Sequence, residues 1–134
     1  MTQTTFIRNF LDWFSLKPKL NDDPKKRLRF KEREVWCAHF GANIGFEIDG
    51  KANYLRPCLI IKKINNETFF AIPLTSKLKD GSWYHPSLIK SKEGRYIFSQ
   101  MRVLDAKRLS YFVETINEDD FTSVKTKFIE FFKV

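Results

Sequence analysis

The sequence predicts a mainly β protein of the α+β class, in which short strands form one small, strongly bent barrel and a helix closes the chain. Several short apolar runs, rich in β-branched and aromatic residues, are separated by segments that contain glycine, proline or asparagine. From Asn117 onward the apolar residues instead recur at helical spacing. At 134 residues, 43% of them hydrophobic, the chain is long enough for one domain that closes its core without disulfides.

Five or six strands are expected between Glu34 and Ile116. The runs PCLIIKKI and TFFAIPL are separated by the short segment NNE, a spacing typical of a β-hairpin whose strands are both buried. Two longer segments, 41–54 and 75–87, are rich in turn-forming residues and are predicted as loops. The expected strands are 34–40, 57–64, 68–74, 95–104 and 110–116, with a single helical turn at 105–109.

A helix is also expected near the N-terminus, because phenylalanines recur there every four residues. Its apolar stripe comprises Phe6, Ile7, Phe10, Leu11 and Phe14, and Thr4 or Thr5 is the expected cap. The polar face is not richly basic, which favours packing on the body of the protein over resting on a membrane surface.

The final helix is expected to begin at Asn117, with Asp120 three residues further on in a position typical of a capping box. Apolar side chains at helical spacing predict one buried stripe. Its expected members are Phe121, Val124, Phe128, Ile129, Phe131 and Phe132.

Basic residues are concentrated near the N-terminus. The chain has 24 Lys+Arg and 16 Asp+Glu, a formal net charge of +8, which either favours a polyanion such as nucleic acid or serves solubility. Residues 17–33 contribute eight basic and three acidic side chains, a net of +5, and form a solvated tether or a contact to phosphates. We therefore expect an N-terminal helix and basic arm over residues 1–30 and a barrel domain over residues 31–134.

Composition argues against several classes of protein. Cys37 and Cys58, the only cysteines, lie in apolar runs without a framework spacing, so two buried thiols in a reducing compartment are expected. No segment has the ~20 apolar residues of a membrane span, and the N-terminus lacks the layout of a signal peptide. The histidines do not stand at metal-ligand spacing with the cysteines. We expect a cytoplasmic protein without a metal, a cofactor or a membrane partner.

An arginine opens the most apolar strand. Pro57 cannot donate a ladder hydrogen bond and belongs at the first residue of its strand, which places Arg56 at the rim of the sheet. Thr75 stands about as far after the hairpin turn as Arg56 stands before it, so antiparallel pairing would bring a guanidinium and a hydroxyl together. Such a pair suits a phosphate and its transition state. The alternative is that Arg56 pairs with Glu47 or Asp49 and only closes the loop.

The two histidines are further candidates. His39 ends the first expected strand and is either an acid or base that titrates near neutral pH or a residue with a local hydrogen bond. His85 stands beside Trp83 and Tyr84 in a segment that either stacks exposed bases or is packed down by its own aromatic rings.

Four short motifs over residues 33–109 occur in the order found in a known family. They are Gly45-Phe46-Glu47 within REVWCAHFGANIGFEIDG, Arg56-Pro57 at the start of RPCLIIKK, Thr75 and Ser76 near the end of AIPLTSK, and Gln100, Arg102 and Asp105 within SQMRVLDAKRL. Together they resemble the MazF/PemK family of toxin endoribonucleases. Residues 1–30 have no counterpart in the shortest members and look like an added arm.

The resemblance implies an SH3-like barrel that forms a homodimer and cuts single-stranded RNA (mRNA) without a metal. The substrate's 2′-hydroxyl would attack the phosphate, leaving a 2′,3′-cyclic phosphate and a 5′-hydroxyl. By position, Arg56 matches the catalytic arginine and Thr75 its hydroxyl partner. A cognate antitoxin that threads a segment over the groove, operator DNA binding through the antitoxin complex, and growth inhibition are also implied. The residues expected near the RNA are Glu47, Ser76, Lys77, Gln100 and Arg102.

The chain departs from the family pattern at two positions. Some members have a histidine before the loop glutamate and an acidic residue before the Q-x-R glutamine, where this chain has Phe46 and Ser99. A second proton-transferring group is therefore not evident, and a guanidinium is a poor general base. The alternative is a non-catalytic toxin, or a module that binds nucleic acid or antitoxin, on the same fold.

Overall fold

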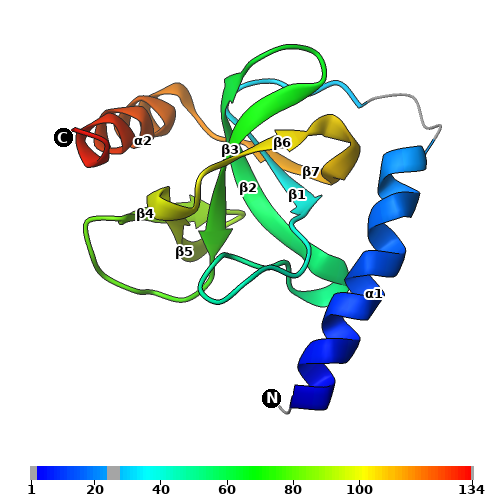
Figure 1. The fold of residues 1–134 in the computed structure, drawn as a ribbon. Coiled ribbons are helices and arrows are strands. Elements are labelled where there is room, and N and C mark those ends of the chain that lie inside the picture. Colours follow the sequence, from blue (N-terminus) through cyan, green and yellow to red (C-terminus); the bar gives the residue numbers. More distant parts are fainter. Residues whose placement is uncertain (1–2, 24–27, 134) are drawn as a thin grey trace.

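Seven antiparallel strands, curled into one sheet, and a helix at each end make up the part of the chain that the computed structural model describes, residues 3–23 and 28–133 (Figure 1). The helices α1 and α2 lie on opposite sides of the sheet in this view, and the mainly β, α+β class is as predicted. The elements are α1 (Gln3–Asp22), β1 (Glu34–His39), η1 (Ala52–Tyr54), β2 (Leu55–Lys63), β3 (Thr68–Thr75), β4 (Tyr84–Ile89), β5 (Lys92–Ile97), η2 (Phe98–Gln100), β6 (Arg102–Asp105), η3 (Ala106–Arg108), β7 (Leu109–Thr115) and α2 (Glu118–Phe131), where η marks a 3-10 turn.

The sheet is an open, curled form of the expected barrel. Its strands follow the order β4-β5-β3-β2-β1-β7, and β6 also pairs with β3. The first half of β3 pairs with β6, whereas Leu74 and Thr75 at its end pair with β5. Among the described residues β4 and β7 do not pair, so the barrel is not closed. The two edges approach where the Lys90 amide donates to Glu114 Oε1 at 3.4 Å.

The β2–β3 hairpin has the register that its sequence symmetry predicts. Cys58 lies opposite Pro73, and the same register carried two residues further sets Arg56 against Thr75. A bulge in the middle of β2 adds one residue to that strand. The turn is held by Asn65, whose side-chain oxygen accepts hydrogen bonds from two amides across it. The hairpin therefore brings the two predicted rims to one end of the sheet.

Strand β2 is buried on both faces, because apolar clusters pack on both sides of the sheet. Cys58 belongs to one cluster, in which the rings of Phe30 and Phe69 lie 4.9 Å apart. Its neighbour Leu59 belongs to the other cluster, which Phe121 of α2 covers. Two buried faces explain why this strand is continuously apolar rather than alternating.

Both cysteines are free and buried, as predicted. Burial raises the pKa of the Cys58 thiol, so this group is an unreactive part of the core. In the described ranges of the chain, no helix combines the length and the apolar character needed to span a bilayer.

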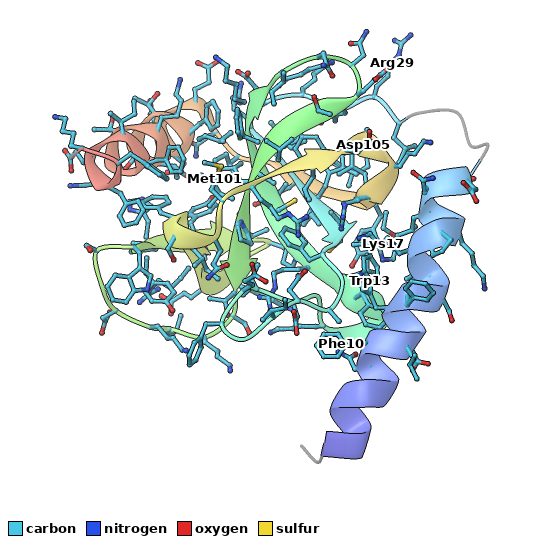
Figure 2. All side chains as sticks on the ribbon, in the orientation of Figure 1. Phe10, Trp13, Lys17, Arg29, Met101 and Asp105 are labelled. Carbon is cyan, nitrogen blue, oxygen red and sulfur yellow. The ribbon has the colours of Figure 1, made fainter. Side chains whose placement is uncertain are left out.

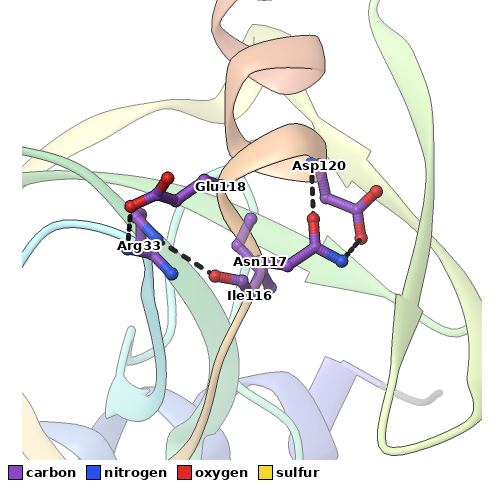
Figure 3. Close-up of polar contacts among 5 residues, drawn as sticks. All are labelled: Arg33, Ile116, Asn117, Glu118 and Asp120. Atoms are coloured by element: carbon purple, nitrogen blue, oxygen red, sulfur yellow. Dashed lines mark hydrogen bonds and ion pairs between the residues drawn. The ribbon is translucent and has the colours of Figure 1, made fainter.

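A polar cluster holds the start of α2 (Figure 3). Asn117 Oδ1 accepts a hydrogen bond from the Asp120 amide at 2.8 Å, and Asn117 Nδ2 donates to Asp120 Oδ2 at 3.1 Å. Beside it, Arg33 Nε donates to the Ile116 carbonyl at 3.1 Å, and Arg33 Nη1 lies 3.4 Å from Glu118 Oε1. The predicted helix start is confirmed, and these bonds tie it to the residue before β1.

The apolar stripe of α2 is narrower than predicted. Phe121 and Val124 are buried, and the phenylalanines at 128 and 131 are half-buried. Ile129 and Phe132, however, are 60% and 49% exposed. Figure 1 shows the end of α2 projecting beyond the sheet, so only one face of its last turns is covered.

Helix α1 is longer than predicted. It continues through Pro18 to Asp22, so the first part of the expected arm is helical rather than a linker. A proline inside a helix has no backbone N–H to donate and therefore tends to kink or end the helix. Here the helix nevertheless continues for four residues past Pro18. Residues 24–27 of the predicted arm lie outside the described residues.

The packing face of α1 also differs from the prediction. Trp13 is buried, whereas Phe10 and Phe14 of the expected stripe are 43% and 72% exposed. The side chain of Phe6 lies outside the described residues. Figure 2 shows Trp13 on the side of α1 that faces the sheet, and Leu16 and Leu20, three and seven residues further on, are half-buried. The packing face therefore runs through Trp13, Leu16 and Leu20 and not through the predicted phenylalanines.

Strand assignment was wrong in two segments. β4 (Tyr84–Ile89) begins within the segment 75–87 that was expected to be a loop and continues two residues past it, and its Pro86 is tolerated because β4 is an edge strand. The expected strand 95–104 is broken by η2 into β5 and β6, which pair with different parts of β3. The helical turn expected at 105–109 is present as η3.

The cap of α2 gives a test of the fold. Replacing Asn117 with alanine removes the acceptor for the Asp120 amide, and we expect the free energy of unfolding to fall by about 1 kcal/mol. Urea denaturation followed by circular dichroism measures this change. Asn66→Ala, in the exposed hairpin turn, is the control and should change stability by less than about 0.5 kcal/mol. Equal denaturation midpoints for the two variants would contradict the assigned cap.

Candidate functional site

The guanidinium of Arg56 is buried where β2 and β3 meet the loop of residues 41–54, which we call the covering loop. Only 7% of Arg56 is exposed. Nε donates to the carbonyl oxygen of Asp49 at 2.6 Å, and Nη1 donates to the carbonyl oxygen of Leu74 at 3.0 Å. Burial lowers the pKa of Arg56 and the charge of Asp49 opposes this shift, but a guanidinium remains a cation. One cation therefore joins the covering loop to the end of β3.

The end of β3 presents hydroxyl groups next to this cation. Thr75, which follows the carbonyl that Arg56 binds, is half-buried, and Ser76 and Lys77 are exposed. Thr75 Oγ1 accepts a hydrogen bond from the Lys77 amide at 3.2 Å, forming a local turn. Lys51 Nζ of the covering loop donates to Ser76 Oγ at 3.4 Å. Two hydroxyls and three cationic side chains thus gather at this end of the sheet.

Side-chain amides hold the covering loop in place. Gln100, from η2, accepts a hydrogen bond from the Ile48 amide at 3.1 Å and donates to the Phe46 carbonyl at 3.1 Å. Inside the loop, Asn43 Nδ2 donates to the carbonyls of Phe40 and Ile48. Phe46 itself, at the tip, is fully exposed.

Two carboxylates also accept hydrogen bonds from backbone amides within the covering loop. Asp49 Oδ1 accepts from the Asn43 amide at 2.6 Å, and Glu47 Oε1 accepts from the Ile44 amide at 3.0 Å. Arg56 therefore closes the loop through the backbone carbonyl of Asp49, not through a carboxylate as the ion-pair alternative expected.

Two further arginines lie beside the covering loop. Arg102 of β6 lies over the ring of Phe40 at 6.0 Å, and Arg108 of η3 donates to the His39 carbonyl at 3.0 Å. Burial lowers the pKa of both groups; Glu47 opposes the shift at Arg102, while Arg102 adds to the shift at Arg108. Guanidinium groups close enough to affect each other create a local positive field that suits an anion.

The seven predicted site residues all lie at the covering loop or at the end of β3. The Arg56 guanidinium reaches the carbonyl before Thr75 rather than the Thr75 hydroxyl itself. Gln100, expected near RNA, uses both ends of its amide on the loop. The seven residues form two groups. The group at the end of β3 comprises Arg56, Thr75, Ser76 and Lys77, and the group on the η2–β6 side comprises Glu47, Gln100 and Arg102.

The histidines have local partners. His39 Nδ1 lies 3.0 Å from the carbonyl oxygen of Asn53, and because a carbonyl only accepts, this nitrogen carries a proton. The ring of His85 stacks against those of Tyr96 and Phe98. Burial lowers the pKa of His85. For His85 the geometry favours the alternative of a segment packed by its own aromatic rings.

Sequence reasoning missed the groups that organise the covering loop. Lys51 and Asn43 were not singled out. For Asn43 a signal existed, because an asparagine in a glycine-containing loop commonly bonds the nearby backbone, whereas Lys51 bonds the distant Ser76 hydroxyl. Trp13 and Tyr54 also contact each other at the edge of this loop, with ring centroids 5.3 Å apart. Among the residues that the structure describes, no cluster of three His, Cys, Asp or Glu side chains could hold a metal ion.

Comparison with protein-family models identifies the family. Residues 31–132 match the model described as PemK-like, MazF-like toxin of type II toxin-antitoxin system. The chain belongs to this toxin family. The part of the chain that matches the PemK/MazF model runs from the segment before β1 to the end of α2, so α1 precedes it. A search of curated proteins gave no match.

Solved structures of PemK/MazF toxins share this fold. The Mycobacterium tuberculosis toxin MazF-mt6 aligns with a TM-score of 0.57 and 10% identity, over 75% of this chain and 96% of its own. MazF from Deinococcus radiodurans aligns with a TM-score of 0.58 and 18% identity, over 77% and 96%. A mycobacterial endoribonuclease in complex with its cognate antitoxin aligns with a TM-score of 0.55 and 12% identity, over 74% and 90%. At these identities the likeness establishes the fold.

Gln100 provides a test of how the covering loop is held. In Gln100→Ala both bonds to the loop are lost. If their loss lowers the free energy of loop opening by about 1.4 kcal/mol, chymotrypsin should cut after the exposed Phe46 about tenfold faster. Gln100→Glu keeps the acceptor for Ile48 but loses the donor, and its rate should fall between the two. Ser99→Ala, at the exposed neighbouring position, is the control. Equal rates in all four proteins would show that Gln100 does not hold the loop.

Proposed function

We propose that this chain is an endoribonuclease toxin of a type II toxin-antitoxin system, which cuts single-stranded RNA, in particular mRNA, without a metal. The observation that carries the proposal is the placement of the Arg56 guanidinium beside Thr75, at the mouth of the hairpin, in a chain of the PemK/MazF family. A planar cation next to a hydroxyl offers several donors to the oxygens of one phosphate.

The reaction is an attack within the substrate. The 2′-oxygen of a ribose bonds to the adjacent phosphorus and loses its proton, the bond from phosphorus to the 5′-oxygen breaks, and that oxygen gains a proton. The products are a 2′,3′-cyclic phosphate and a 5′-hydroxyl. Arg56 stabilises the additional negative charge on the phosphate oxygens in the transition state, and the Thr75 hydroxyl donates to one of them.

Access to Arg56 requires the covering loop to move. The guanidinium has five N–H donors and places Nε and Nη1 on two carbonyls, which leaves donors for a phosphate. Because Arg56 is buried, the phosphate reaches it when part of the loop is displaced. The loop carries Lys51 and Glu47, and its exposed Phe46 offers a ring on which a base can stack.

Charge supports a polyanionic substrate. The net charge is +8, and the basic side chains at the site are Lys51 within the covering loop and Lys77, Arg102 and Arg108 beside it. Glu47, Ser76 and Gln100 lie among them, where they would contact bases or sugars. RNA binding should therefore weaken steeply as salt rises, because the phosphates release counterions when they bind.

The partners follow from the same family membership. A mycobacterial relative of this fold is in complex with its cognate antitoxin. We propose that an antitoxin likewise covers the site of this chain, that the toxin is a cytoplasmic homodimer, and that operator DNA is bound through the toxin–antitoxin complex. Growth inhibition would follow from cutting mRNA.

A non-catalytic binder is the second candidate function. The observation that favours it is the position of Arg56, buried under the covering loop and bonded to two carbonyls. The serine at position 99, where some family members have an acidic residue, also favours a non-catalytic protein. Such a protein would hold RNA or antitoxin without cutting.

RNA cleavage in the presence of a chelator separates the two functions. We expect wild type to cut a long single-stranded RNA, Arg56→Ala to be about 100-fold slower or worse, and Thr75→Ala about tenfold slower, from the loss of donors to a developing charge. Lys133→Ala, at an exposed position just after α2, and Thr122→Ala, at an exposed position on α2, are matched controls for lost charge and lost hydroxyl and should cut like wild type. RNA that is retarded in a gel by wild type but remains uncut would support the binder, and cutting that Arg56→Ala retains would refute the assigned role.

A further inference from the structure

Helix α1 is attached to the covering loop through one tryptophan. Trp13 is 7% exposed, and its ring centroid lies 5.3 Å from that of Tyr54, the last residue of the loop. The Tyr54 hydroxyl donates to the carbonyl oxygen of Asn9 at 2.9 Å. Figure 2 shows Trp13 between the helix and the sheet. Both the side chain and the backbone of α1 therefore contact the end of the loop.

The first residue of the covering loop accommodates the same tryptophan. Gly41 has a φ of +82°, a conformation that L side chains rarely adopt, and a Cβ at this position would overlap the Trp13 ring. Glycine is therefore required here both by the backbone and by the indole. α1 touches the loop at its beginning and at its end.

The end of the covering loop has an unusual backbone. Asn53 and Tyr54 have φ values of +55° and +60°, in the left-handed region that aromatic residues seldom enter. The Tyr54 amide donates to the Lys51 carbonyl at 2.8 Å, and the Tyr54 carbonyl accepts from the Phe40 amide at 2.9 Å. Strain of this kind persists only where the surroundings hold it, and α1 adds the Trp13 and Asn9 contacts to these two bonds.

The strained backbone leads directly into the candidate site. Strand β2 begins at the next residue, Leu55, and Arg56 follows it. Arg56 in turn binds the carbonyl of Asp49 within the same loop. Any rearrangement of Tyr54 would therefore move the backbone of Arg56 and the loop that covers it.

A second set of contacts leads from α1 to the same backbone. Arg108 lies over the Trp13 ring at 5.8 Å and donates to the His39 carbonyl at 3.0 Å. The ring of His39 bonds the carbonyl of Asn53, the first of the two strained residues. Trp13 is thus connected to the strained pair directly through Tyr54 and indirectly through Arg108 and His39.

We propose that α1 is a positioning element of the candidate site: Trp13 holds both ends of the covering loop and the strained Asn53–Tyr54 backbone, and so sets the position of Arg56. Trp13 acts through Gly41 and Tyr54 and does not touch the substrate. The consequence for catalysis rests on the proposed function. Because α1 precedes the matched residues 31–132, this support is separate from the part of the chain that defines the family.

Substitutions at Trp13 in the full chain test this proposal with two measurements. Hydrogen exchange reports the order of residues 50–56, and RNA cleavage reports kcat and KM separately. In Trp13→Ala we expect exchange of 50–56 to rise at least tenfold and kcat to fall at least tenfold, with KM within about threefold, because the position of Arg56 matters most in the transition state. Trp13→Phe keeps an aromatic ring, so its exchange of residues 50–56 and its kcat should both stay close to the wild-type values. Phe14→Ala, 72% exposed on the same helix, should match wild type.

The outcomes separate a positioning role from a general loss of structure. Tyr54→Phe removes only the hydroxyl bond to Asn9 and should change exchange and kcat in the same directions by about threefold, which tests the proposal if Trp13→Ala does not fold. Unchanged exchange of 50–56 in Trp13→Ala, or raised exchange with unchanged kcat, overturns the proposal. If wild type cuts no RNA, the proposed function fails, and the exchange result alone decides whether α1 orders the loop.

Discussion

The buried positive charge of Arg56 is the constraint on which the candidate site depends. Removing a cation from water costs several kcal/mol unless polar groups replace its hydration. Here the replacements are two backbone carbonyls, one from the covering loop and one from β3, at 2.6 and 3.0 Å. Hydrogen bonds to a charged group contribute about 1.5–3 kcal/mol each, so the loop and the strand end are held where this charge needs them. The same geometry keeps the guanidinium next to Thr75, where the proposed phosphate site lies.

The covering loop is held from three other directions, which gives it a defined closed position. Gln100 binds its middle, Asn43 binds across its interior, and Trp13 supports its two ends. The bonds of Gln100 and Asn43 are part-buried or exposed, whereas the sheet below is buried on both faces. A loop of this kind opens far more readily than the sheet unfolds. A closed loop over a buried cation therefore combines a stable resting state with a route by which the proposed RNA substrate would reach the cation.

The sequence predicted what depends on local pattern and missed what depends on tertiary contact. The hairpin register followed from symmetry about its turn, and the start of α2 followed from the capping pattern of Asn117. β4 was missed because Pro86 argues against a strand unless that strand is known to be an edge. The role of Trp13 was missed because its partners, Gly41 and Tyr54, lie far along the chain. The burial of Arg56 was likewise unpredictable, since its partners are backbone carbonyls that carry no residue-specific signal.

The Nε–H of Arg56 offers the most direct measurement of this constraint. Its exchange with water can be followed by 15N NMR in the unmodified protein, with the signal assigned by its loss in Arg56→Lys. A proton that is buried and bonded to the Asp49 carbonyl should exchange at least about 100-fold more slowly than the Nε–H of Arg29, which is exposed. Exchange of the two protons at similar rates would show that Arg56 does not join the covering loop to β3, and the account of the site would be wrong.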